Sequence, residues 1–243
     1  MPGYIDKVCT WFYSTNVAPK FVEAPYAWTT PQYGSIQPHL TTPINSSPLI
    51  SAPEKTRLQE IVRSLLYFPR YVNSTILANL GSIRTNISDG TERVAEMAAY
   101  LFNFCANNRN PKVGYYASDV QLCGHTDASY LSVSKAQSRA AAYSYLSTDD
   151  GAILPPNHNL KLPARPNGAV HVMSTLTQQV LSSATEAEVG ATFYGYQDAI
   201  PLRNTLADLG HVQGATLIIT YNEFCEFILN NTVKQRRSKA MDM

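Results

Sequence analysis

The spacing of hydrophobic residues divides the chain into a helical stretch and a stretch of strands. Apolar residues recur every three or four positions from Glu54 to Tyr71 and again from Thr91 to Asn107. This is the spacing of amphipathic helices. After Lys112 the pattern changes to alternation, over residues 120–126 and then 138–147, which is typical of β-strands. We therefore expect two or three packed helices followed by a sheet.

The second half of the chain predicts further elements in a definite order. They are a short strand segment at 115–117, a strand at 169–175 after a Pro-, Asn- and Gly-rich loop, a long helix from about 184 to 209, a strand at 215–221 and a short helix at 222–230. Ser182 or Ser183 is the expected N-cap of the long helix, and Pro201 is expected to kink it. Hairpin-joined strands followed by a strand reached through a helix predict an α/β fold with a mixed sheet, antiparallel first and then parallel.

The stretch before the helices has a different composition. Residues 15–56 are rich in Pro, Thr, Ser and aromatic residues and sustain neither the helical nor the strand period. Such a segment is expected to be extended and to need a surface to lie against. The predicted organisation is an arm over 1–56, a helical segment over 57–111 and an α/β domain over 112–243.

Composition and charge narrow the class of protein. The chain has 243 residues, of which 44% are hydrophobic and 15% charged, with a net charge of +1. It can bury a core, and no global field draws it to nucleic acid or to a membrane. Its one dense basic cluster is Lys234, Arg236, Arg237 and Lys239. The four cysteines lack C-x-x-C spacing, and no signal peptide or membrane span is evident, so we expect an intracellular protein, cytoplasmic or nuclear and not secreted.

The candidate chemistry lies where the predicted sheet gathers acidic side chains. Asp127 is expected to end the first strand, Glu188 lies in the first turns of the long helix, and Tyr221 ends the last strand beside the first. Strand ends and helix starts at one edge of such a sheet converge. Carboxylates gathered in this way can bind a pair of Mg²⁺ ions roughly 4 Å apart, which is the arrangement of two-metal nucleases.

Several motifs together resemble one known family. They are His-Thr-Asp-Ala-Ser-Tyr at 125–130, Ser-Ser-Ala-Thr-Glu-Ala-Glu-Val at 182–189, Leu-Gly-His at 209–211 and Lys-Gln-Arg-Arg-Ser-Lys-Ala-Met-Asp-Met at 234–243. This combination resembles the end of a copia-type retrotransposon polyprotein, at its ribonuclease H domain. Residues 1–5 and the helices up to about Asn110 similarly resemble the thumb and connection of the reverse transcriptase. The resemblance thus covers nearly the whole chain.

The resemblance implies a ribonuclease H-like mixed sheet and assigns roles within it. Asp127 and Glu188 become catalytic Mg²⁺ ligands, and RNA:DNA hybrids become the substrate. The family has Asp at the position of Tyr221, and a phenol is neutral near pH 7. The family's fourth carboxylate follows a fifth strand, and this chain stops at Met243 before both. We therefore expect a truncated, catalytically degenerate pseudoenzyme. Its expected nucleic-acid contacts are Asn222, Arg236, Arg237 and Lys239.

Other interpretations of the same residues remain open. Asp127 also suits a strand-end turn, and both Glu188 and Glu186 suit exposed first-turn positions favoured by the helix dipole. If Glu223 replaces the missing ligand, the protein is an active Mg²⁺-dependent nuclease for RNA:DNA hybrids. Alternatively, the chain is a recruited structural subunit. Its Pro-rich arm would dock on a protein partner, and an exposed sheet edge would accept a strand from a partner or a second copy.

Overall fold

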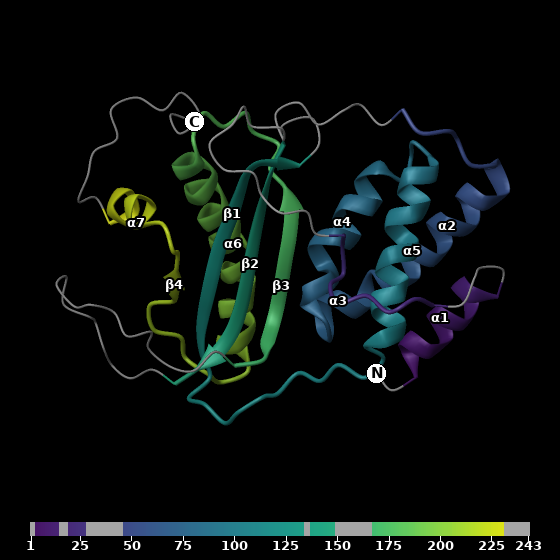
Figure 1. The fold of residues 1–243 in the computed structure, drawn as a ribbon. Helices are drawn as coiled ribbons and strands as arrows, with labels where there is room; N and C mark the ends of the chain where they lie inside the picture. Colours follow the sequence, from purple (N-terminus) through teal and green to yellow (C-terminus); the bar gives the residue numbers. More distant parts are fainter. Residues whose placement is uncertain (1–2, 15–18, 28–45, 134–136, 149–166, 231–243) are drawn as a thin grey trace. The chain divides into compact units, whose positions relative to one another are not determined.

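The computed structural model describes residues 3–14, 19–27, 46–133, 137–148 and 167–230 (Figure 1). The chain forms two compact units, one of residues 1–112 with 133–136 and the other of 113–132 with 137–243. The first unit holds the helices that precede residue 112, and the second holds the sheet. The expected arm and the expected helical segment both fall within the first unit.

The first unit is built from helices. They are α1 (Tyr4–Tyr13), α2 (Ala52–Leu65), α3 (Tyr67–Tyr71), the 3₁₀ turn η2 (Ser74–Ile76), α4 (Leu77–Asn86) and α5 (Glu92–Asn107). A capping box starts α2, in which the Ser51 side chain accepts from the Glu54 backbone N–H and the Glu54 carboxylate accepts from the Ser51 N–H. The predicted continuous helix over 54–71 is divided, because α2 ends at Leu65 and α3 begins at Tyr67.

The expected extended arm contains a helix at its start. Helix α1 buries Ile5, Val8, Cys9 and Phe12, and the Phe12 ring stacks on Phe102 of α5 with 4.2 Å between centroids. The prediction of an extended arm is wrong for these residues. Their amphipathic spacing forms a helix, and the Pro-rich composition that favours an arm lies further along the chain. The arm residues 15–18 and 28–45 lie outside the described part of the chain.

The second unit contains a mixed sheet. Its elements are β1 (Gln121–Val133), β2 (Gln137–Ser147), β3 (Ala169–Leu176), α6 (Ala184–Asp208), β4 (Leu217–Ile219) and α7 (Glu223–Leu229). The four-stranded sheet has the order β3-β2-β1-β4. Strands β2 and β3 pair antiparallel, whereas β4 pairs parallel to β1. The short connection over 134–136 requires β1 and β2 to be antiparallel as well. The predicted α/β class with a mixed sheet is confirmed.

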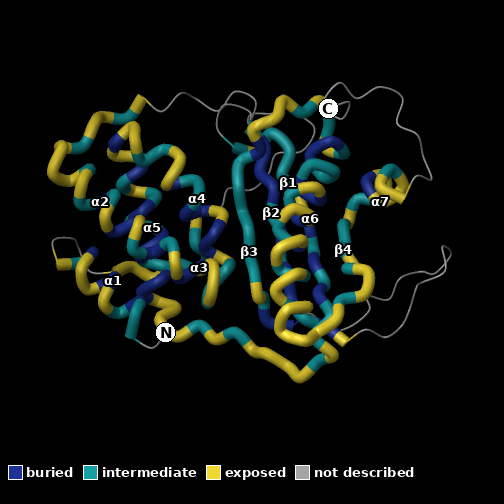
Figure 2. Tube along the Cα trace, turned by 180° about the vertical axis from the view of Figure 1, so that it is seen from behind, coloured by how far each residue is buried: buried dark blue, intermediate teal, exposed yellow. Residues whose placement is uncertain are grey.

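Small residues let α6 lie close to the sheet. Ala187, Ala191, Gly195 and Ala199 recur at every fourth position of the helix, and all four are buried. Much of α6 is exposed (Figure 2). Its exposed residues include Phe193 and Ile200. Pro201 lies inside the helix, which continues to Asp208 as expected. Among the described residues, no helix combines the length and the apolar character that crossing a lipid bilayer requires.

Three strand predictions differ from the structure. The strand predicted over 215–221 is shorter, since β4 spans only Leu217–Ile219. Residues 115–117 are irregular, and the Tyr116 backbone N–H instead donates to the Asn167 side chain at 2.8 Å. Strand β1 does not end at Asp127 but continues to Val133, because it pairs with β2 along this extension. Asp127 is therefore a mid-strand residue and not a turn residue.

Candidate carboxylate site at the edge of the sheet

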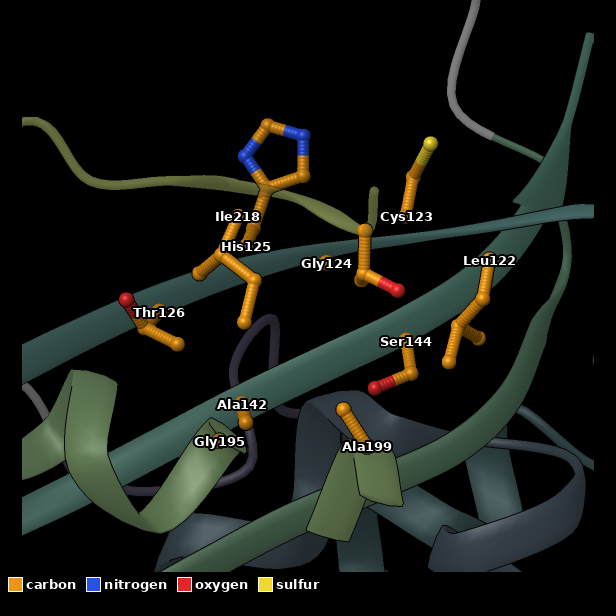
Figure 3. Close-up of a pocket in the computed structure, with 11 residues that line it drawn as sticks. Leu122, Cys123, Gly124, His125, Thr126, Ala142, Ser144, Gly195, Ala199 and Ile218 are labelled. Carbon is orange, nitrogen blue, oxygen red and sulfur yellow. The ribbon is translucent and has the colours of Figure 1, made fainter. Parts of the chain in front are cut away.

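Strand alternation sets the direction of the side chains along β1. Leu122, Gly124 and Thr126 are buried on the side covered by α6. His125 and Cys123 point away from α6, as Figure 3 shows. Asp127 follows His125 at the next position of the same parity and is exposed. Asp127 thus lies on the side of the sheet that faces away from α6.

Glu188 comes to Asp127 from α6. Its carboxylate accepts a hydrogen bond from the Ala128 backbone N–H and lies close enough to Asp127 for their charges to interact. Strand β4 ends at Ile219, opposite His125, so it does not pair with β1 beyond that point. The Glu188 carboxylate takes the place of a strand partner for this segment of β1. The two predicted carboxylates are therefore brought together.

The Glu188 carboxylate is held in an unfavourable environment for a charge. Burial raises its pKa, and the neighbouring Asp127 raises it further, whereas the Ala128 hydrogen bond lowers it. Its Oε2 atom is buried, and no described residue hydrogen-bonds to it. Buried carboxylate oxygens in folded proteins nearly always have a partner. A proton or a cation at this position would satisfy the atom.

Buried polar groups fix the turn of α6 that carries Glu188. The Thr192 hydroxyl donates to the Glu188 backbone carbonyl at 3.0 Å, lies 3.0 Å from the Thr126 hydroxyl and lies 3.9 Å from the Cys225 sulfur. Cys225 is the buried residue of α7, and burial raises the pKa of its thiol. This chain of contacts joins β1, α6 and α7. No local sequence pattern predicts these contacts, because they join three segments that lie far apart in the sequence.

Glu186 is not the exposed residue that the sequence suggested. It is buried, and its carboxylate accepts from the Ser182 backbone N–H at 2.7 Å. Its own N–H donates to the N-cap Ser183 hydroxyl at 3.1 Å. The Ser-x-x-Glu spacing of Ser183 and Glu186 is the capping-box signal and could have predicted this role. Glu186 therefore holds the start of α6, and Glu188 is the carboxylate that reaches β1.

Tyr221 occupies the third predicted position but contributes no charge. Strand β4 ends at Ile219, which pairs with His125, and Tyr221 follows two residues later in a bend. The Tyr221 side chain is 72% exposed. Its ring stacks on His125 with 6.0 Å between centroids. The residue at the third predicted position is thus an exposed aromatic ring that packs on His125.

The donor set limits the metal that the site could hold. Within the described ranges, no cluster of three or more His, Cys, Asp or Glu residues has a metal-binding arrangement. Glu223, the proposed substitute ligand, is exposed in the first turn of α7 and joins no such cluster. Mg²⁺ can be bound through one or two carboxylates while it keeps several waters. Asp127 and the Glu188 oxygen to which no described residue hydrogen-bonds are therefore the two groups that could hold one hydrated cation.

The remaining predicted contacts lie elsewhere. The Asn222 side chain caps α7 by accepting from the Cys225 N–H at 2.9 Å. Arg236, Arg237 and Lys239 lie outside the described residues. The cavity between α6 and the sheet that Figure 3 shows has a volume of about 10 Å³, which is room for one water at most. Neither Asp127 nor Glu188 lines this cavity.

Comparison of the chain with protein-family models, with curated proteins and with solved structures finds no match.

Proposed function

We propose that the second unit is a ribonuclease H-like domain derived from a copia-type retrotransposon polyprotein, and that it no longer cuts RNA:DNA hybrids. The observation that supports this most directly is the neutral, exposed Tyr221 at the third ligand position. The mixed sheet order and the approach of Glu188 to Asp127 agree with such an origin. Loss of cutting would leave a folded module that acts by binding.

The chemistry of hybrid cleavage explains why one substitution matters. In a two-metal nuclease the metal activates water and stabilises the leaving oxygen of the phosphodiester. Asp127 and Glu188 supply two carboxylates, and burial and the neighbouring Asp127 raise the pKa of Glu188. Tyr221 adds no charge, since a phenol is neutral near pH 7. The residues present can therefore hold a cation beside β1 but lack the charge that a second one requires.

A cleavage assay with matched variants tests the proposal. Full-length wild type, Tyr221→Asp and Tyr221→Asn would be incubated with a labelled RNA:DNA hybrid and Mg²⁺ or Mn²⁺. We expect no cutting by wild type or by Tyr221→Asn, and cutting by Tyr221→Asp, because only Asp restores the charge. The added substitution Asp127→Asn should abolish that gain.

The outcomes separate loss of the ligand from other causes. Wild-type cutting that Asp127→Asn removes would contradict a degenerate site and would direct the search to Glu223, tested as Glu223→Gln. If folded Tyr221→Asp does not cut, the tyrosine is not sufficient to explain inactivity. Thermal unfolding with and without Mg²⁺ gives a readout that does not depend on activity. A Mg²⁺-dependent rise in Tm that is lost in Asp127→Asn supports the single-cation site.

A role as an interaction subunit is the second candidate, and one observation favours it. Aromatic side chains next to the carboxylates are directed to solvent, with Tyr221 72% and Phe224 55% exposed. Exposed large aromatic residues beside a polar site are typical of protein-binding surfaces. The chemistry of this surface indicates the kind of partner that it would bind.

A further inference from the structure

Three aromatic rings form a stack across the strands of the second unit. Tyr145 of β2 is 1% exposed, and its ring lies 5.6 Å from the His125 ring of β1 at an interplanar angle of 25°. The Tyr145 hydroxyl lies 3.3 Å from His125 Nε2. His125 in turn stacks on Tyr221 at 6.0 Å and 30°. The stack is therefore buried at Tyr145 and ends at the solvent with Tyr221.

The outer end of the stack presents an aromatic surface that another planar group can extend. One face of the Tyr221 ring is directed toward His125, yet 72% of the side chain remains exposed. Because the Tyr221 ring already packs on His125, it has less freedom to lose when a ligand binds, and the entropic cost of binding is smaller. A flat group placed on the outer face would continue the series of rings.

The charge around the stack is negative. Asp127 lies two residues along β1 from His125, on the same side of the strand, and is exposed. Glu223 and Glu226 are exposed in the helix that follows Tyr221. Along β1, β4 and α7 the sequence has no Lys or Arg. The buried Glu188 oxygen, to which no described residue hydrogen-bonds, is a further acceptor for a positively charged donor.

We propose that the outer face of Tyr221 binds the guanidinium group of an arginine presented by a protein partner. A guanidinium is planar and stacks on aromatic faces, and its edge donors pair with carboxylates such as Asp127. A lysine ammonium has no flat face to stack. A nucleotide would stack as well, but its phosphate would be repelled by the surrounding carboxylates. The combination of ring and charge thus favours arginine.

Binding of this kind needs neither a metal nor cleavage. Arginine binding and the proposed loss of hybrid cleavage involve the same edge of the sheet. Each of these two proposals can be wrong while the other is right. Cutting of a hybrid by the wild type would overturn the degenerate site and would leave arginine binding to be decided by its own assay.

The test uses full-length protein and three fluorescein-labelled probes in EDTA. The probes are a peptide with three arginines separated by glycines, the same peptide with lysines, and a single-stranded RNA. Fluorescence anisotropy gives each Kd. The variants are Tyr221→Ala, Tyr221→Phe and Asp127→Asn, with Tyr196→Ala as control because Tyr196 is an exposed tyrosine on α6. Circular dichroism and Tm verify that each variant is folded.

We expect wild type to bind the arginine peptide more tightly than the lysine peptide. Tyr221→Ala should weaken arginine binding about two- to thirty-fold, the range of a cation–π contact. Tyr221→Phe should bind as wild type does, since the ring is kept, and Tyr196→Ala should also be unchanged. Asp127→Asn should weaken binding of the arginine peptide and reduce its dependence on salt.

Four results would overturn the proposal or its assignment to a protein partner. The first is equal affinity for the arginine and lysine peptides. The second is an arginine affinity that Tyr221→Ala leaves unchanged in folded protein. The third is RNA binding that depends on Tyr221 and is not displaced by the arginine peptide. The fourth is tighter binding of the arginine peptide by the double variant Arg236→Ala, Arg237→Ala. This result would mean that the chain's own arginines compete for the site and would overturn the assignment to a partner.

Discussion

At the scale of single residues, Glu188 has the most constrained environment of the carboxylates at the candidate site. It combines a buried oxygen that no described residue pairs with, a neighbouring Asp127 and a backbone donor at Ala128. Burial and Asp127 both raise its pKa. The folded state therefore binds a proton at Glu188 more readily than the unfolded chain does, and folding is coupled to pH at this position.

Glu188→Gln should stabilise the protein at neutral pH and have little effect in acid. Below the unfolded pKa of about 4.3 the carboxyl is protonated in both states, and its stabilising contribution is fully present. That contribution is lost as the pH rises through the higher folded pKa, whereas glutamine does not titrate. We expect a gain of about 0.5–1 kcal/mol at pH 7, a modest figure because solvent screens a half-buried charge.

Denaturant unfolding of wild type and Glu188→Gln at a series of pH values would measure this effect. Glu226→Gln is the matched control, since Glu226 is an exposed glutamate in α7. An unfolding free energy that differs between wild type and Glu188→Gln by the same amount at pH 4 and pH 7 would show that the charge at Glu188 is not the cause.

At the scale of elements, the fit of α6 against the sheet depends on a single glycine. A Cβ atom added at Gly195 would lie 2.6 Å from Thr126 Cγ2 and 3.6 Å from Ala142 Cβ, whereas one added at Gly190 would meet nothing within 4 Å. Both glycines lie within α6. The close approach at Gly195 brings Thr192 within reach of Thr126 and thereby positions the turn that carries Glu188.

Gly195→Ala and Gly190→Ala should consequently have opposite effects. The first overpacks the contact with Thr126 and should cost about 1–3 kcal/mol of stability. The second removes a flexible residue from a helix and should contribute about 0.5–1 kcal/mol. Thermal or denaturant unfolding measures both. Equal effects of the two substitutions would mean that helix propensity, rather than packing on the sheet, governs position 195.

The limits of each element could be predicted only where local signals set them. Asn222 before α7 and Ser183 before α6 are N-caps that can be read in the sequence, and both helices begin where expected. Strand β1 extends past Asp127 because it pairs with β2, which is a tertiary effect. The sequence predicted Asp127 and Glu188 as the two carboxylates of the site. It did not predict the hydrogen bond from the Ala128 N–H to Glu188, because that bond depends on where β4 ends. The ring stack of Tyr221 and His125 likewise has no local signal.

At the scale of the whole molecule, the chain is organised as two units with separate interiors. The helical unit has a core that includes Leu101, Phe102 and Ile61, each at most 1% exposed. The sheet unit buries α6 against its strands through small residues. Because each unit is compact by itself, we expect the two to unfold as distinct cooperative bodies.

Calorimetry should therefore resolve two transitions that respond to different substitutions. Leu101→Ala leaves a cavity in the helical core and should lower one transition, with a cost of about 2–5 kcal/mol. Gly195→Ala should lower the other. A single transition that both substitutions shift together would show that the units fold as one cooperative body and would contradict two independent cores.

The Ala128 amide proton, which is hydrogen-bonded to the Glu188 carboxylate, can serve as an NMR reporter for this edge of the sheet. Because β4 ends before Ala128, the amide proton of this residue depends on a side chain rather than on a neighbouring strand. Any event that changes the charge or position of that side chain alters the magnetic environment of the proton. The chemical shift and the exchange rate of this one amide would thus record protonation, cation binding or the arrival of a partner at the edge of the sheet.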